Sequence, residues 1–161
     1  MKVDMKKIKL SQGKIALVSD VDYVYLNQWK WHYCNGYAFR NINYKNRRKT
    51  LRMHRVILER MGFTNFKDTD HVNGNGIDNR RSKLRPATRL QNQWNKAVSI
   101  HNTSGYKGVY WYRITNKWKA QIGVQGKRKH LGYFKTRVKA AEAYNKAAKK
   151  YFGKFARLNQ I

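Results

Sequence analysis

The chain has 161 residues, the length of one or two small domains, which excludes a large multi-domain enzyme. It carries 36 Lys and Arg against 8 Asp and Glu, a net charge of +28 that an enzyme of a neutral metabolite does not need and that predicts a polyanionic partner. A single cysteine excludes an intrachain disulfide, and the absence of a long apolar run predicts a cytoplasmic protein that is not secreted and has no membrane partner.

The first sixty residues predict short strands and two short helical segments. The pairs Gln12-Gly13 and Asn35-Gly36 are typical hairpin turns. A helical turn is expected over residues 20–28, and the apolar spacing over residues 51–61 favours a short helix that ends at Gly62.

Residues 70–79, Asp-His-Val-Asn-Gly-Asn-Gly-Ile-Asp-Asn, form the most unusual stretch. Its two Asn-Gly pairs predict a tight turn and a loop. After the loop, Thr88 and Gln91 have the spacing of a capping box, so a helix over residues 89–98 is expected. This helix is expected to bring the amide of Asn92 back to the loop.

Asp70, His71 and Asn92 have the chemistry that phosphodiester hydrolysis requires, an activated water and a cation that neutralises the phosphate. A carboxylate and an amide oxygen are hard ligands that suit Mg²⁺ or Mn²⁺. His71 titrates near neutral pH and suits a general base. Neighbours on a regular strand point to opposite faces, so Asp70 and His71 converge on one metal only if the strand ends or bulges there.

The last sixty residues predict a separate unit of three strands and one helix. Residues 99–105 are polar and indicate a linker. Over residues 117–124 apolar and basic side chains alternate, which is typical of a strand with one buried and one basic face. A further strand follows the Gln125-Gly126 turn, and Thr136 is a good N-cap for an alanine-rich helix that ends at Gly153. The whole chain is therefore predicted to be α+β.

The segments Asp-His-x-Asn-Gly-Asn, Asp-Asn-Arg-Arg, Leu-Arg-x-Ala-Thr and Gln-Asn-x-x-Asn between residues 70 and 95 resemble the HNH endonucleases of bacteriophages and introns. The similarity covers about residues 8–98 and implies a ββα-metal fold with its core at about residues 50–98. It implies that Asp70 and Asn92 hold one divalent metal and that His71 activates the water. The implied products are a 5′-phosphate and a 3′-hydroxyl, with nicking and double-strand cleavage both open.

The sequence departs from that family at Lys83, where the family usually has an Asn that braces the loop. Either Asn79 takes this role or the activity is weakened. His54 is equally compatible with a structural hydrogen bond and with support of the site through a neighbour. Asn95 is the alternative amide if Asn92 is not the ligand.

Residues 103–160 resemble the Apetala-two, or ethylene-response-factor, DNA-binding domain. The resemblance is carried by Ser-Gly-Tyr-Lys-Gly-Val from residue 104, Trp-x-Ala-x-Ile from residue 118, Leu-Gly-x-Phe from residue 131 and the alanine-rich helix. That family lays a three-stranded sheet in the major groove. Mapped by position, the resemblance implies that the DNA-binding residues are Lys107, Tyr110, Tyr112, Lys117, Lys119, Gln121, Arg128 and His130.

Together these features predict a monomeric homing-type HNH endonuclease that acts on double-stranded DNA in the cytoplasm of an infected bacterial cell. Its expected domains are a nuclease domain over residues 1–98 with an N-terminal β-rich extension, a linker over 99–105 and a DNA-binding domain over 106–161. Two alternatives stay open: a catalytically silent DNA-binding protein, in which Lys83 has removed cleavage, and an RNA-binding basic protein.

Overall fold

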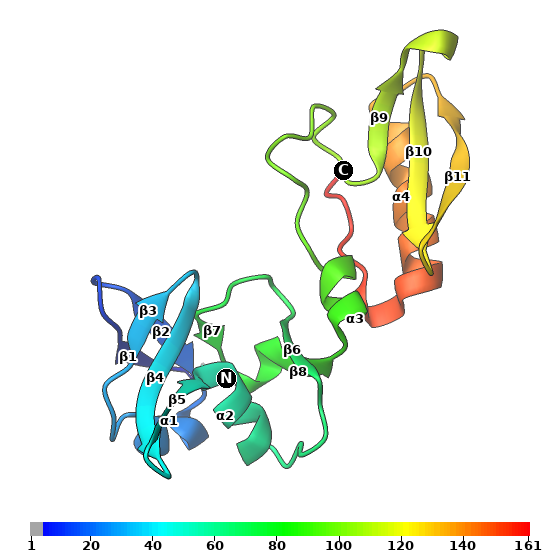
Figure 1. Ribbon diagram of the computed structural model, residues 1–161. Helices are drawn as coiled ribbons and strands as arrows, with labels where there is room; N and C mark the ends of the chain where they lie inside the picture. Colours follow the sequence, from blue (N-terminus) through cyan, green and yellow to red (C-terminus); the bar gives the residue numbers. More distant parts are fainter. Residues whose placement is uncertain (1–4) are drawn as a thin grey trace. The chain divides into compact units, whose positions relative to one another are not determined.

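A computed structural model describes residues 5–161 of the chain (Figure 1). The chain divides into two compact units between Asn92 and Gln93, whereas the sequence predicts a boundary after residue 98. Both units are mixed α+β with small, mostly antiparallel sheets, which confirms the α+β class predicted for the chain. Trp94 stacks on Phe152 with ring centroids 4.6 Å apart, so the segment after Asn92 packs with the C-terminal unit.

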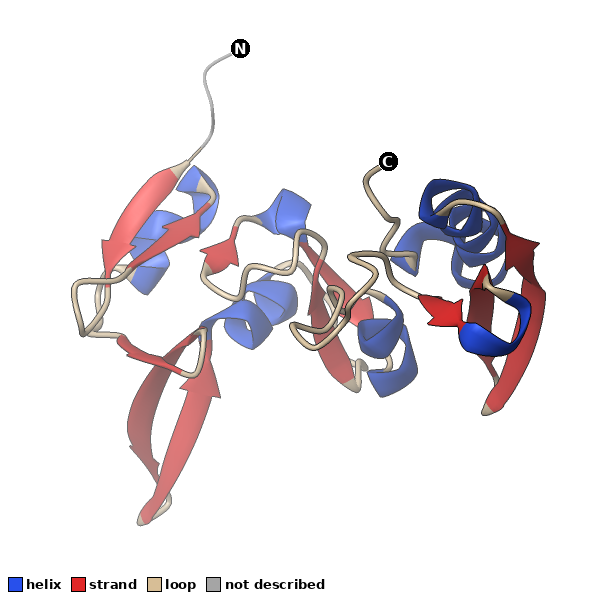
Figure 2. Ribbon diagram, turned by 90° about the horizontal axis from the view of Figure 1, so that it is seen from above, coloured by secondary structure: helices blue, strands red, loops and turns tan. Residues whose placement is uncertain are grey.

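The first half of the N-terminal unit consists of two small sheets, each followed by a short helix. Its elements are β1 (Lys6–Lys9), β2 (Ile15–Val18), α1 (Asp20–Leu26), β3 (His32–Cys34), β4 (Tyr37–Tyr44), β5 (Arg47–Arg52) and α2 (Met53–Arg60). The antiparallel pairing of β1 with β2 and of β3 with β4 confirms both predicted hairpins. In Figure 2 the long β4–β5 hairpin extends away from the rest of the unit.

The second half of this unit contains the unusual stretch. Its elements are β6 (Asp68–His71), β7 (Asp78–Asn79), the 3-10 helix η1 (Arg81–Lys83), β8 (Leu84–Ala87) and α3 (Arg89–Trp94). Strand β6 pairs antiparallel with β8, and β7 pairs parallel with β2.

The predicted capping box at the start of α3 is confirmed. Thr88 N donates to Gln91 Oε1 at 2.8 Å, and Gln91 N donates to Thr88 Oγ1 at 3.2 Å. The predicted end at residue 98 is wrong, because α3 ends at Trp94. The carbonyls of Trp94 and Lys96 instead accept hydrogen bonds from Lys107 Nζ at 2.6 and 2.7 Å, and these replace the bonds that a longer helix would make internally.

The core of the N-terminal unit is formed mainly by β1, β2 and α2. Met53, Ile57 and Leu58 are fully buried at helical spacing. Buried Asp22 of α1 accepts hydrogen bonds from Arg60 Nε at 2.9 Å and Arg81 Nε at 2.7 Å. These ion pairs tie α1 to α2 and to η1, which fixes the start of β8.

The C-terminal unit is a three-stranded sheet covered on one face by a helix (Figure 1). Its elements are β9 (Val109–Tyr112), the 3-10 helix η2 (Arg113–Thr115), β10 (Lys117–Val124), β11 (Lys127–Phe134), α4 (Arg137–Phe152) and the 3-10 helix η3 (Gly153–Phe155). The strand order is β11-β10-β9 and all pairs are antiparallel, and the three strands and one helix confirm the predicted elements.

The alternating pattern of β10 accounts for this packing. Ala120 and Ile122 are buried against α4, and the residues between them face away from the helix. Thr136 caps α4, since its Oγ1 accepts from Lys139 N at 3.2 Å. Across residues 5–161, no helix combines the length and the apolar character that spanning a membrane requires.

Candidate functional site

The predicted catalytic residues lie on β6 and α3 of the N-terminal unit. Strand β6 pairs with β8 without a register shift, and Asp70 lies opposite Arg85. Because side chains alternate along a strand, Asp68 and Asp70 share one face of β6 and His71 points to the other. Strand β6 ends at His71. The sequence predicts that Asp70 and His71 can converge on one metal only if the strand ends or bulges at this point, and the first of these conditions is met.

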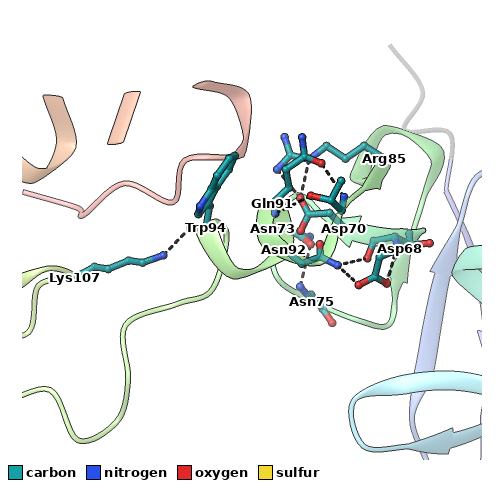
Figure 3. Close-up of polar contacts among 11 residues, drawn as sticks. Asp68, Asp70, Asn73, Asn75, Arg85, Gln91, Asn92, Trp94 and Lys107 are labelled. Carbon is teal, nitrogen blue, oxygen red and sulfur yellow. Dashed lines mark hydrogen bonds and ion pairs between the residues drawn. The ribbon is translucent and has the colours of Figure 1, made fainter. Parts of the chain in front are cut away.

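Arg85 holds the carboxylate of Asp70. Its Nε donates to Asp70 Oδ2 at 2.7 Å, and its Nη2 lies 2.5 Å from the same oxygen (Figure 3). Both side chains are largely buried. The carboxylate predicted to hold a metal is therefore already oriented by a cross-strand arginine.

Asn92 contacts Asp68, an acidic residue that lies outside the motif of residues 70–79. Its Nδ2 donates to Asp68 Oδ2 at 2.7 Å and to the Thr69 carbonyl at 3.2 Å (Figure 3). Both partners are acceptors, so the amide nitrogen faces them and Oδ1 points elsewhere. Asp68 could have been identified from the sequence, because it lies two residues before Asp70 and residues at this spacing share one face of a strand.

The Oδ1 atom of Asn92 is buried and has no hydrogen-bond partner. A buried acceptor without a partner costs free energy, so this oxygen is available to a cation or a donor group on a ligand.

Asn92 also lines a pocket of about 360 Å³. It combines a carboxylate, a guanidinium, an imidazole and two aromatic rings, and its lining residues are Asn35, Tyr37, Phe39, Arg52, His54, Asp68, Thr69 and Asn92. Asp70 and His71 are not among the described residues that line it. The pocket therefore brings together one predicted site residue, Asn92, and several that the sequence does not single out.

A hydrogen bond to Asn79 fixes the tautomer of His71. His71 Nε2 lies 3.1 Å from Asn79 Oδ1, and Asn79 Nδ2 donates to Met53 Sδ at 3.5 Å. An amide oxygen only accepts, so Nε2 carries the proton and the neutral ring has its lone pair on Nδ1. Of the two alternatives that Lys83 leaves open, the contacts agree with the first, in which Asn79 takes the bracing role.

The pKa of His71 is lowered from 6.5. Burial lowers it, and the hydrogen bond with Asn79 and the charges of Asp70 and Asp78 offset part of the effect. The ring is therefore neutral at pH 7 and able to accept a proton.

His54, at the start of α2, is a second neutral imidazole. Burial lowers its pKa to about 3, with smaller contributions from His71, Arg52 and Arg55. Its ring centroid lies 5.1 Å from that of His71, with the two rings nearly perpendicular. Its Nδ1 is buried without a hydrogen-bond partner, and the residue lines the pocket. His54 thus links His71 to the pocket by packing.

A divalent cation fits the oxygen donors of this region. Asp68 supplies a carboxylate and Asn92 the unpartnered Oδ1. Within residues 5–161, no three His, Cys, Asp or Glu side chains gather as a complete metal site. Few protein ligands suit Mg²⁺, which usually keeps several waters and binds substrate phosphate.

The C-terminal sheet has a basic and aromatic face opposite α4. Lys119 lies at its centre, directly across from Tyr110 on β9 and Tyr133 on β11. Its Nζ lies 5.6 Å from the Tyr110 ring centroid, 5.2 Å from that of Tyr112 and 6.0 Å from that of Tyr133. The hydrogen bond with Tyr110, with the nearby tyrosines, raises the pKa of Lys119, so the ammonium stays charged.

The register brings most of the predicted DNA-binding residues onto this face. Tyr110 OH donates to Gln121 Oε1 at 2.8 Å, and Gln121 lies opposite His130. Two further pairs complete the face, Lys117 opposite Tyr112 and Arg128 opposite Gly123.

Lys107 is the exception among the predicted residues. Its ammonium donates to two backbone carbonyls, those of Trp94 and Lys96, and burial lowers its pKa to about 8, with Arg157 adding to the effect. Figure 3 shows the side chain directed to Trp94. Its contacts therefore give no support to the expectation that Lys107 reads DNA, and they assign it to the end of α3.

Comparison with curated proteins gives three informative similarities. An uncharacterized HNH endonuclease of Acanthamoeba polyphaga mimivirus is 38% identical over 93 residues, which are 57% of this chain and 46% of the relative. Protein 3.8 of Escherichia phage T7 is 34% identical over 59 residues, 37% of this chain and 49% of the relative. The AP2-like ethylene-responsive transcription factor TOE2 of Arabidopsis thaliana is 44% identical over 59 residues, 37% of this chain and 12% of the relative.

The chain thus spans about half the length of the two viral relatives and a small part of the plant factor. No family model matches the chain, and no solved structure matches it. The similarities nevertheless agree with both resemblances in the sequence. The chain is similar both to an HNH endonuclease and to Apetala-two-type transcription factors.

Proposed function

We propose that this protein is a metal-dependent DNA endonuclease of the HNH type, with a C-terminal sheet that binds duplex DNA in the major groove. The observation that carries the proposal is the pair of Asn92, whose Oδ1 is buried and unpartnered, and Asp68, which accepts from Asn92 Nδ2, both lining one pocket. The order β6, loop, β8, α3 supports assignment of this region to a ββα-metal arrangement. The name of the mimivirus relative agrees with it.

In this proposal a divalent cation, Mg²⁺ or Mn²⁺, neutralises charge on the phosphate and lowers the pKa of water when bound. Asn92 would hold it through Oδ1 together with a carboxylate of β6, either Asp70 as the sequence predicts or Asp68, the acid that Asn92 contacts through Nδ2. His71 accepts the proton of the attacking water at Nδ1. Water oxygen bonds to phosphorus as the bond to O3′ breaks, and O3′ takes a proton from solvent water, which leaves a 5′-phosphate and a 3′-hydroxyl.

We further propose a homing-type enzyme that acts as a monomer in the cytoplasm of an infected bacterial cell. The phage relative supports this setting.

Cleavage of supercoiled plasmid tests the enzymatic part. We expect Mg²⁺ or Mn²⁺ to give nicked or linear product and EDTA to stop the reaction. His71→Ala is expected to lower the cleavage rate by about 10²-fold or more, because a general base contributes that much, while duplex binding in EDTA stays nearly unchanged. Equal cleavage by the variant shows that His71 is not the base.

The same assay identifies the metal-holding carboxylate. Asp68→Asn and Asp70→Asn each remove one charge at constant size. If Asp68 is the ligand, its variant needs more Mg²⁺ for half-maximal cleavage than the Asp70 variant does. The reverse order assigns the role to Asp70.

DNA binding without cleavage is the second candidate function. It is favoured by the ion pair between Asp70 and Arg85, which occupies the carboxylate that the family uses. Duplex binding with no nicking under any divalent metal supports this candidate and contradicts the enzyme.

A further inference from the structure

The outer half of the β4–β5 hairpin is exposed on both faces. Ala38, near the base of the hairpin, is fully buried, whereas all residues from Asn43 to Thr50 are exposed. The strands are joined at Lys45 and Asn46, both with positive φ, which is the conformation of a tight two-residue turn. An isolated two-stranded ribbon gains little stability of its own, so its length requires another explanation.

The hairpin is strongly basic and has no acidic residue of its own. Between Asp22 and Glu59 the sequence contains no Asp or Glu, and its basic residues from β4 to β5 are Arg40, Lys45, Arg47, Arg48, Lys49 and Arg52. The ion pairs found among residues 5–161 involve none of them. Arg40 packs over Trp29, with its Cζ 4.1 Å from the ring centroid. The four basic residues of the outer half are exposed to solvent: Lys45, Arg47, Arg48 and Lys49.

The charges point to both sides of the ribbon. Arg48 lies opposite Asn43, whereas Arg47 and Lys49 lie opposite Tyr44 and Ile42 on the other face. A ribbon that is positive on both faces suits a groove with two anionic walls better than a flat surface. The major groove of duplex DNA has phosphates on both walls and is about 12 Å wide, which admits a two-stranded ribbon.

One face of the ribbon leads directly from the candidate pocket. Phe39 and Arg52 are paired across the strands, and both line the pocket. The next pair outward is Asn41 with Thr50, whose Oγ1 donates to Asn41 Oδ1 at 2.8 Å. This bond orients the Asn41 amide, whose nitrogen is a donor suited to a base edge.

We propose that the β4–β5 hairpin enters the major groove of the duplex beside the cleavage site. Arg47, Arg48 and Lys49 contact phosphates on the two walls, and Asn41 faces the base edges. The proposal rests on the proposed function because it places the hairpin in the DNA that the pocket holds. Binding in EDTA tests it without any cleavage.

The test compares two double variants of the full chain that lose the same charge. Arg48→Gln with Lys49→Gln changes the hairpin, and Lys7→Gln with Lys9→Gln changes exposed lysines of β1 as the control. Affinity for a duplex is measured against salt. The hairpin variant is expected to lower the magnitude of the slope of log affinity against log salt by about 1.8, two contacts at about 0.9 each, and the control is expected to change it much less.

A second duplex with bulky groups on cytosine C5, which fill the major groove, locates the contact. These groups exclude the C-terminal sheet from the groove in the wild type and the variant alike, so a difference between the two reports on the hairpin. On this duplex the hairpin variant and the wild type are expected to bind equally, because the hairpin is already excluded. If the hairpin variant loses the same affinity relative to the wild type on both duplexes, the hairpin does not enter the major groove. Equal thermal unfolding of the two variants and the wild type establishes that the fold is retained.

The outcomes separate this inference from the proposed function. If the hairpin variant keeps the wild-type slope while the wild type cuts plasmid, the hairpin inference is wrong and the nuclease stands. If the wild type does not bind duplex DNA, both fail. Tighter binding of single-stranded RNA than of the duplex also overturns the inference and favours the RNA-binding alternative.

Discussion

At the residue scale, the two buried imidazoles of His54 and His71 have lowered pKa values that bear on the proposed reaction. Both have a pKa below the ordinary 6.5 because burial removes the hydration of the charged ring. For His71 this direction suits a general base, which must be neutral before it accepts a proton. The bond to Asn79 adds orientation by fixing Nδ1 as the acceptor.

The pH dependence of cleavage follows from this lowered pKa. The neutral ring of His71 is lost as pH falls, so the rate is expected to decline on the acid side with a midpoint below 6.5. Single-turnover cleavage at saturating Mg²⁺ between about pH 5 and 8 measures it. A midpoint above 6.5 contradicts the assignment of His71.

Stability must be followed over the same range, because His54 also responds to pH. Its pKa is about 3 in the folded chain and near 6.5 when unfolded, so the unfolded state binds the proton first. Its contribution to stability is complete above pH 6.5 and is lost as pH falls toward 3. Circular dichroism at each pH separates unfolding from loss of the base.

At the scale of elements, the turn before β9 depends on a glycine. Gly108 has φ +75°, and a Cβ added there would collide with the Tyr144 ring and lie 2.6 Å from the Gln121 carbonyl oxygen. This close approach brings the strand start against α4 and β10.

Gly108→Ala is expected to destabilise the C-terminal unit by about 2 kcal/mol or more, since strain at positive φ and overpacking add. Gly126→Ala is the matched control, because Gly126 has the same φ of +75° and no atom within 4 Å of the added Cβ. Urea unfolding of both variants measures the difference. Equal losses show that the contact with Tyr144 and Gln121 is not tight.

Strand β11 shows how an element changes a functional surface. The register shifts between Ala120 and Gln121, so Gly132 pairs with Ala120 and His130 with Gln121. The extra residue, Leu131, brings both His130 and Tyr133 onto the basic face, although simple alternation separates them. For this reason Tyr133 is not among the DNA-binding residues predicted from the sequence.

At the scale of the whole molecule, four of the eight acids have partners that stabilise the fold. Asp22, Asp70 and Asp78 pair with arginines, and Asp68 accepts from Asn92. Four arginines are the partners in these ion pairs, and the other basic residues lie in both units. These paired acids therefore stabilise the N-terminal unit, and the excess of positive charge is what the proposed binding of DNA uses.

Salt dependence tests this distribution of charge. If on the order of eight phosphate contacts form, log affinity for duplex DNA is expected to fall against log salt with a slope of about −7. Fluorescence anisotropy of a labelled duplex in EDTA measures it. An affinity that does not change with salt contradicts binding of the phosphate backbone by these charges.

The net charge, the hairpin turns, the capping box of α3 and the ends of α4 can all be predicted from the sequence. The charge is a sum over the chain, and the turns, the cap and the helix ends are each encoded by residues within a few positions of one another. The sequence also placed Asp70, His71 and Asn92 in one short region through their order along the chain.

The contacts between distant groups could be established only from the folded structure. It pairs Asn92 with Asp68, Asp70 with Arg85, and Lys107 with the end of α3. These partners are 11 or more residues apart, or on strands whose register must be known, so local patterns carry no signal for them. Register and packing decide such contacts, because they depend on how distant segments fold together.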